Sequence, residues 1–247
     1  MSDFVRVCSK GGLAKIKALL EDGAEVNAVT KYGKTGLMQA SQYGRVNVVK
    51  FLLSHGADVN AVTDGGDGAL LYASWKGHAT VVKFLLVQGA DIEAENQYCS
   101  TPLMQASQYG HTEVVRTLLM AGACVNTPND VMITELMLAS DKGHVDVVAL
   151  LLEYGADVDL EGKYGHTALI RASRNGHTAV VQMLRVAHAK KRWSILRMHV
   201  RMWRFAWWYF EMRVKRNHEA HFTSDGKAVI TGHTARAYKR DWANMMS

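Results

Sequence analysis

The sequence predicts an all-α protein, built as a solenoid of short paired helices with a C-terminal amphipathic helical extension. The main observation is a block that recurs every 33 residues: TGLMQASQYG at Thr35–Gly44 returns as TPLMQASQYG at Thr101–Gly110, two periods later. The second is that each block contains two short apolar stripes with helical spacing, separated by glycine. A fixed period of this length is typical of a solenoid, in which each unit buries its apolar face against its neighbours.

The composition narrows the class of protein. The chain has 247 residues, of which 48% are hydrophobic, and this is enough to bury a large core. Its three cysteines show no C-x-x-C spacing, which disfavours a disulfide framework and a zinc site and favours an intracellular setting, cytoplasmic or nuclear. The N-terminus has no signal-peptide pattern. The longest run of bulky apolar residues, 205–210, is far shorter than the roughly 20 residues that span a bilayer.

Residues 33–65 illustrate one unit. Thr35 can cap a first helix whose inner face, 37–41, is small and apolar, and Gly44 ends that helix. A second helix follows over 46–53, and Gly56 stops it. A loop then leads to the next unit. The repeating element is therefore expected to be helix–turn–helix followed by a projecting turn.

At this point the sequence resembles the ankyrin repeat family. The residues that carry the resemblance are Thr101-Pro102-Leu103, Gly110-His111 and LLSHGADVN at Leu52–Asn60. The resemblance covers residues 4–187. We therefore place a repeat array at 1–187, which begins with a truncated unit over 1–32, and a separate extension at 188–247. Full units begin at Gly33, Gly66, Cys99, Met132 and Gly165. It implies a module that binds a protein partner through a concave face and needs no cofactor.

Two departures from the family pattern stand out. The family's His after the Leu is replaced by an apolar residue in every full unit, so the helix starts are expected to be tied together differently. These residues are Met38, Leu71, Met104, Met137 and Ile170. The turn at Pro128–Val131, before Met132, is expected to have an irregular tip.

In this architecture the turn tips and the outer ends of the first helices form a groove, where we place the partner-binding residues. Unit by unit they are Lys31, Tyr32, Lys34, Gln42 and Tyr43; Asp64, Gly65, Asp67, Trp75 and Lys76; Gln97, Tyr98, Ser100, Gln108 and Tyr109; Asp130, Val131, Ile133, Asp141 and Lys142; and Lys163, Tyr164, His166, Arg174 and Asn175. Six of them are aromatic, and Tyr and Trp dominate interface hot spots. The alternative is that these rings pack on adjacent turns.

Metal sites and catalysis are disfavoured. His78, His111, His144 and His177 recur at the repeat period, but neighbouring units stack roughly 10 Å apart, so a structural role at the start of each second helix is favoured over zinc. His218–His221 reads HEAH, one residue short of the H-E-x-x-H signature. Asp64–Gly68 lacks the terminal Glu of a calcium loop. No catalytic motif is present, so we predict that the protein is not an enzyme.

The extension at 188–247 differs from the array in charge. It carries 13 Lys/Arg against 4 Asp/Glu, whereas residues 1–187 carry 16 against 19. An apolar seam with alternating spacings of three and four residues runs along it, which is typical of one helix face. The seam consists of Trp193, Leu196, Val200, Trp203, Trp207, Phe210 and Val214.

Three interpretations of this seam remain open. It can dock on the exposed end of the last repeat, bind calmodulin as a basic amphipathic target, or lie on an anionic membrane surface. Nucleic acid is disfavoured as a partner. The leading prediction is a non-catalytic protein–protein interaction module that uses the groove. The alternative is an adaptor whose tail binds calmodulin or a membrane while the array holds a second partner.

Overall fold

A computed structural model describes residues 3–192, and in this part of the chain it confirms the all-α repeat solenoid. The first helices of the units are α1 (Asp3–Lys10), α3 (Gly36–Gln42), α5 (Ala69–Lys76), α7 (Pro102–Gln108), α9 (Glu135–Lys142) and α11 (Ala168–Arg174). The second helices are α2 (Leu13–Glu21), α4 (Val46–Ser54), α6 (Ala79–Val87), α8 (Thr112–Met120) and α10 (Val145–Glu153), followed by a helix over 178–192. Residues 1–190 form one compact unit. The tail seam lies outside the described residues.

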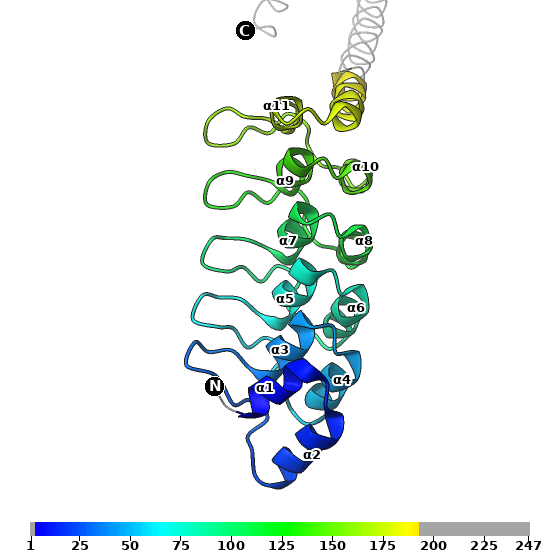
Figure 1. Cartoon of the computed structure of the whole chain (residues 1–247). Helices are drawn as coiled ribbons and strands as arrows, with labels where there is room; N and C mark the ends of the chain where they lie inside the picture. The colour runs from blue at the N-terminus through cyan, green and yellow to red at the C-terminus, as the bar shows by residue number, and fades with distance from the viewer. Residues whose placement is uncertain (1–2, 193–247) are drawn as a thin grey trace, which may run out of the picture. The chain divides into compact units, whose positions relative to one another are not determined.

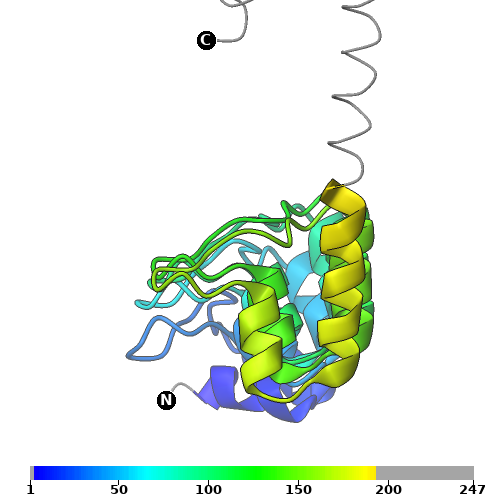
Figure 2. The same cartoon turned by 90° about the horizontal axis from the view of Figure 1, so that it is seen from above.

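The helix pairs of the array stack in one direction. Each first helix packs against the first helices before and after it, and each pairs with the second helix of its own unit. Figure 1 shows the first helices as a central row, with the second helices on one side and the turns projecting on the other. Seen along the stack, the turns form a ledge beside the first helices (Figure 2). The array therefore has an inner surface made of turns and first helices.

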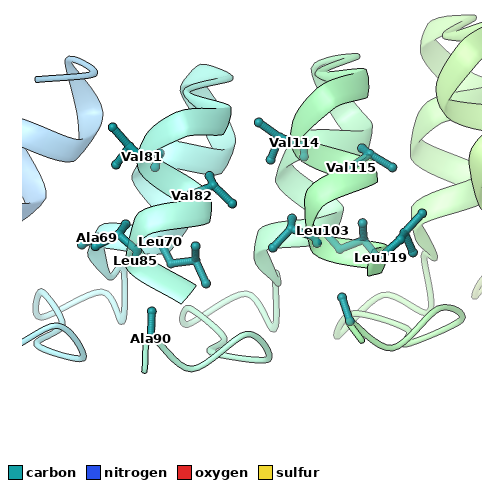
Figure 3. Packing of buried hydrophobic residues seen from close by; sticks show 14 of the residues in the cluster. Ala69, Leu70, Val81, Val82, Leu85, Ala90, Leu103, Val114, Val115 and Leu119 are labelled. Carbon is teal, nitrogen blue, oxygen red and sulfur yellow. The ribbon is translucent and has the colours of Figure 1, made fainter. Parts of the chain in front are cut away.

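The core lies between units. The recurring leucine is almost fully buried at Leu37, Leu70, Leu103 and Leu136, and paired valines of the second helices, such as Val81 and Val82, accompany it. Figure 3 shows Leu70 and Leu103 in two successive units beside the valines of α6 and α8. The same leucine in the last unit, Leu169, is only half-buried, since no further repeat covers it. Burial at this position thus comes from the neighbouring unit.

At the start of α3 the residue that replaces the family's His, Met38, takes part in the helix cap. The Thr35 hydroxyl accepts a hydrogen bond from the Met38 backbone N–H at 3.2 Å, and the Thr35 N–H donates to Met38 Sδ at 3.4 Å. The thioether therefore closes a capping box that a polar side chain usually closes. At the start of α7 the Thr101 hydroxyl likewise accepts a hydrogen bond from the Met104 backbone N–H, at 3.2 Å.

The recurring histidines have the structural role that the repeat spacing favours. Each ring places Nε2 against a backbone carbonyl of the preceding unit, and because a carbonyl only accepts, Nε2 donates. The carbonyls are those of Gln42 for His78 (3.0 Å), Trp75 for His111 (2.9 Å), Gln108 for His144 (3.1 Å) and Asp141 for His177 (3.0 Å). The imidazoles thus tie adjacent units together where the first helix ends.

The glycines that end α3, α5, α7 and α9 make room for these imidazoles. Gly77 has φ +77°, and a Cβ there would lie 2.5 Å from His111 Nδ1. Gly89, which follows α6, also has a positive φ (+83°), but a Cβ there would meet nothing within 4 Å. Both glycines therefore have a left-handed backbone, but only at Gly77 would an added Cβ clash with a neighbouring side chain.

We expect Gly77→Ala to destabilise the array by at least about 1 kcal/mol more than Gly89→Ala. Both changes impose a left-handed conformation on Ala, which costs about 1–2 kcal/mol. Only Gly77→Ala also displaces His111 from the Trp75 carbonyl. Losing this part-buried hydrogen bond leaves the carbonyl without its partner, which costs about 1–3 kcal/mol. Urea denaturation of the two variants measures the difference. Equal losses of stability would contradict the ring-to-carbonyl tie.

The turn before Met132 is regular, so the expected irregular tip is wrong. Met132 has φ +58° and donates its backbone N–H to the Asn129 carbonyl at 2.9 Å. Gly33 does the same in its own turn, donating to the Thr30 carbonyl at 3.0 Å with φ +74°. The backbone bond of the turn holds the chain in this conformation without glycine. The unusual backbone conformation near this turn lies earlier, at Asn126, a residue other than glycine whose φ is +79°.

The last helix does not stop where the other second helices stop. A glycine with positive φ follows each earlier second helix, at Gly23, Gly56, Gly89, Gly122 and Gly155. One period beyond Gly155 the sequence has His188, and the helix continues through 192. Without the left-handed glycine that commonly ends a helix, the chain has no such stop signal there.

A side-chain contact also marks this end of the array. In earlier units an Asn bridges to the next turn: Asn60 donates to the Gly89 carbonyl at 3.1 Å and accepts from the Asp91 N–H at 2.9 Å. At the corresponding position of the last turn Asp159 contacts the His188 imidazole, Oδ1 to Nδ1, at 2.6 Å. The series of side-chain contacts from one turn to the next thus ends at His188, a side chain of the helix over 178–192.

Candidate functional site

The candidate site is the surface between the turns and the first helices. Two contacts join its two walls: Lys34 Nζ, at the base of a turn, donates to Gln42 Oε1, at the end of α3, at 2.7 Å. In the last unit Arg174 Nη1 lies 2.9 Å from His166 Nε2 across the same interval of eight residues. Side chains from turn bases and helix ends therefore line one surface, which we call the groove.

The residues expected in the groove are mostly accessible. Five tyrosines are prominent: Tyr32 is 64% exposed, Tyr43 52%, Tyr98 60%, Tyr109 48% and Tyr164 77%. Also exposed are Lys31, Asp64, Lys76, Gln97, Asp130, Val131, Lys142, Lys163, Arg174 and Asn175. The half-buried members are Lys34, Gln42, Gly65, Asp67, Trp75, Ser100, Gln108, Ile133, Asp141 and His166.

One row of groove residues is missing from the sequence-based set. It lies in the middle of the first helices and consists of Gln39, Tyr72, Gln105, Leu138 and Arg171. Gln105 Nε2 donates to Ser100 Oγ at 2.9 Å, and Lys34 Nζ lies 4.0 Å from the centre of the Tyr72 ring. The sequence did contain a signal for this row. Its position in the repeat varies in residue type from unit to unit, whereas the leucine and the alanine near it are the same in every full unit.

Three rings form an aromatic shelf near the middle of the groove. The centroids of Tyr72 and Trp75 are 6.5 Å apart, and those of Trp75 and Tyr109 are 6.1 Å apart, in tilted arrangements. Lys76 Nζ covers the Trp75 ring at 3.6 Å from its centre. α5 supplies two of the rings and Tyr109 follows α7, so the shelf spans two units. Such a shelf offers a large contact area with few rotatable bonds.

Charged groups around the shelf are held in a network. Asp67 Oδ1 accepts from Asn96 Nδ2 at 3.0 Å. Burial raises the pKa of Tyr72, and the charge and hydrogen bond of Asp67 raise it further. Burial lowers the pKa of Lys34, Asp67 opposes that change and Lys76 adds to it. The network joins Lys34 of one unit to Asp67, Tyr72 and Asn96 of the next.

Neither a metal-holding group nor a membrane-spanning helix is found in the part of the chain that the structure describes. Over residues 3–192 no group of three or more His, Cys, Asp or Glu is placed to hold a metal ion, and no helix is long and apolar enough to cross a membrane. Gly66 in the segment 64–68 forms a turn bond to the Thr63 carbonyl at 2.8 Å. The HEAH sequence at 218–221 falls outside the described residues.

A buried carboxyl group lies away from the groove, at the start of α9. Glu135 is fully buried, and its Oε2 accepts from the Asn126 backbone N–H at 3.2 Å. Oε1 has no hydrogen-bond partner among the described residues. Burial raises the pKa of Glu135 to about 7, an effect that its backbone hydrogen bonds reduce and the nearby Glu93 reinforces. The corresponding residues in other full units are small: Gly36, Ala69, Pro102 and Ala168.

Comparison with known families agrees with this architecture. The family model described as ankyrin repeats matches three overlapping segments, residues 4–96, 62–130 and 103–192, which together cover more than half of the chain. The chain therefore belongs to the ankyrin repeat family. Comparison with curated proteins gives no match. Ankyrin repeats are generally protein–protein interaction modules and are typically not enzymes.

Proposed function

We propose that the protein binds a partner protein through its groove and catalyses no reaction. The observation that carries this proposal is the set of five accessible tyrosines on one surface, which recur at every second unit as Tyr32, Tyr98 and Tyr164 and as Tyr43 and Tyr109. Exposed tyrosines scattered singly would need no explanation, but five of them on one surface offer a large contact area. Tyr and Trp are enriched in binding hot spots because a large area is buried for few ordered bonds.

The competing interpretation is that the rings pack on adjacent turns. Trp75 fits that interpretation in part, since it is half-buried against Tyr109. The five groove tyrosines fit it less well, because each keeps between 48% and 77% of its surface exposed. Partner contact would bury this area, whereas the array alone does not. We therefore assign the rings to recognition.

We expect replacement of Tyr43, Trp75 and Tyr109 by Ala to weaken partner binding while the array stays folded. Each hot-spot truncation costs about 1–3 kcal/mol of binding free energy. The partner is captured from a cell extract with the full chain, identified by mass spectrometry, produced separately and titrated against each variant. Circular dichroism checks the fold.

Tyr154→Ala is the matched control, because Tyr154 is 43% exposed at the end of α10, outside the groove. It should leave the affinity unchanged. Equal affinity for the wild type and the groove variants, with the fold intact, would remove the groove assignment.

The setting that we propose is intracellular. Cys8, Cys99 and Cys124 are all free thiols. Free cysteines are usual in a reducing compartment. The alternative adaptor function depends on the tail seam, and no described residue bears on it.

A further inference from the structure

The groove changes character along its length. The groove residues around the unit that begins at Cys99 carry no formal charge; they are Gln97, Tyr98, Ser100, Gln105, Gln108 and Tyr109. The last unit of the groove, with Lys163, Tyr164, His166, Arg171, Arg174 and Asn175, carries three full positive charges and no acidic residue. The basic cluster lies in the last unit, whereas the aromatic shelf takes its rings from α5 and from the end of α7.

The basic cluster is built from Lys163, Arg171 and Arg174. Lys163 and Arg174 are exposed, and Arg174 lies against the His166 ring. Asp141 is shared between two cations: Arg171 Nη1 lies 3.9 Å from Oδ1, and Lys142 Nζ lies 3.3 Å from Oδ2.

One carboxylate thus faces several cations. Asn175 Nδ2 also donates to Asp141 Oδ1, at 3.0 Å. Arg171 Nε is buried and has no hydrogen-bond partner among the described residues. The neighbouring carboxylate of Glu161 lies on the turn, near Gly165. Positive charge therefore remains in excess at this end of the groove, with guanidinium groups suited to bind carboxylates.

From this arrangement, and resting on the proposed function, we infer that the partner presents an extended acidic segment. Its carboxylates bind the basic cluster of the last unit, and a large apolar side chain packs on the shelf of Tyr72, Trp75 and Tyr109. The shelf lies two to three units before the cluster, or about 20–30 Å at roughly 10 Å per unit. An extended chain rises about 3.3 Å per residue, so about six to nine residues separate the apolar anchor from the acidic group.

The test selects binders from a library of random 15-residue peptides displayed on phage, with the full chain as bait. We expect selected peptides to carry an aromatic or long aliphatic residue about six to nine positions from a group of Asp or Glu. Their affinity should fall as salt is added, because charge pairs at an accessible surface are screened. Selection of neutral or basic sequences, or of none, contradicts the inference.

The charge variants separate this inference from the proposed function. Combined Lys163→Glu and Arg174→Glu should weaken a selected peptide at least about tenfold, since like charges then face each other. Lys83→Glu, an exposed lysine on α6, makes the same kind of change outside the groove and should have no effect. If Trp75→Ala weakens the peptide but the charge reversal does not, the acidic partner is wrong and the groove stands. If neither change weakens it, both proposals fail.

Discussion

Leu103→Ala is expected to lower the free energy of unfolding by about 2–5 kcal/mol, the range for a buried large-to-small change. Leu103 is 1% exposed and lies in α7, which packs between α5 and α9. In a solenoid each unit is held mainly by its neighbours, so a cavity at this interface weakens the coupling between the two halves. A second unfolding transition in calorimetry would report that uncoupling.

Leu169→Ala is the matched control for this experiment. It makes the same chemical change at the same position of the last unit, where the side chain is only half-buried. Its effect should be clearly smaller, because fewer atoms are withdrawn from contact. A loss below about 0.5 kcal/mol for Leu103→Ala, the range for exposed positions, would show that the repeat register is wrong.

Glu135→Gln is expected to stabilise the protein above pH 7 and to have little effect near pH 4.5. Burial raises the pKa of Glu135 from 4.5 to about 7, so the folded state holds its proton over a range in which the unfolded chain has lost it. Stability from this group is therefore full below about pH 4.5 and is lost as the pH rises through about 7. At about 1.4 kcal/mol for each pKa unit, the loss is ~3 kcal/mol.

Gln keeps an oxygen for the Asn126 N–H and removes the charge, which makes it the informative substitution. Glu135→Ala, the residue found at Ala69 and Ala168, also removes the charge but gives up the hydrogen bond. Urea unfolding from pH 4 to pH 8 gives the slope for each variant. If the wild type and Glu135→Gln lose stability in parallel over this range, the carboxyl group titrates as it does in water and this account of its burial is wrong.

The repeat period was enough to predict the fold and the position of most groove residues. Strict spacing fixes which leucine faces the next unit and which residues end a first helix, so the burial of Leu103 and a structural role for His111 could be anticipated from neighbouring copies. The tie between His111 and the Trp75 carbonyl follows the same logic, because the same residue type recurs where each second helix begins.

Features that occur once escaped this reasoning. Glu135 stands where other units have small residues, and only the packing shows a carboxyl group enclosed beside Asn126. The mid-helix row that contains Tyr72 and Arg171 was missed because the spacing of apolar residues identifies only the buried face of a helix. It does not distinguish the remaining positions that face the groove from those that face solvent. His188 interrupts the glycine series, but its contact with Asp159 depends on the path of the final helix.

The most direct test of groove recognition places a photoreactive phenylalanine analogue at position 109 and, in a second protein, at position 154. Both sites carry exposed tyrosines, so the substitution itself is equally tolerated. With the captured partner present, irradiation should crosslink the partner to position 109, and Trp75→Ala should abolish the product. Crosslinking at position 154 with none at 109 would show that the partner binds outside the groove and would contradict the account.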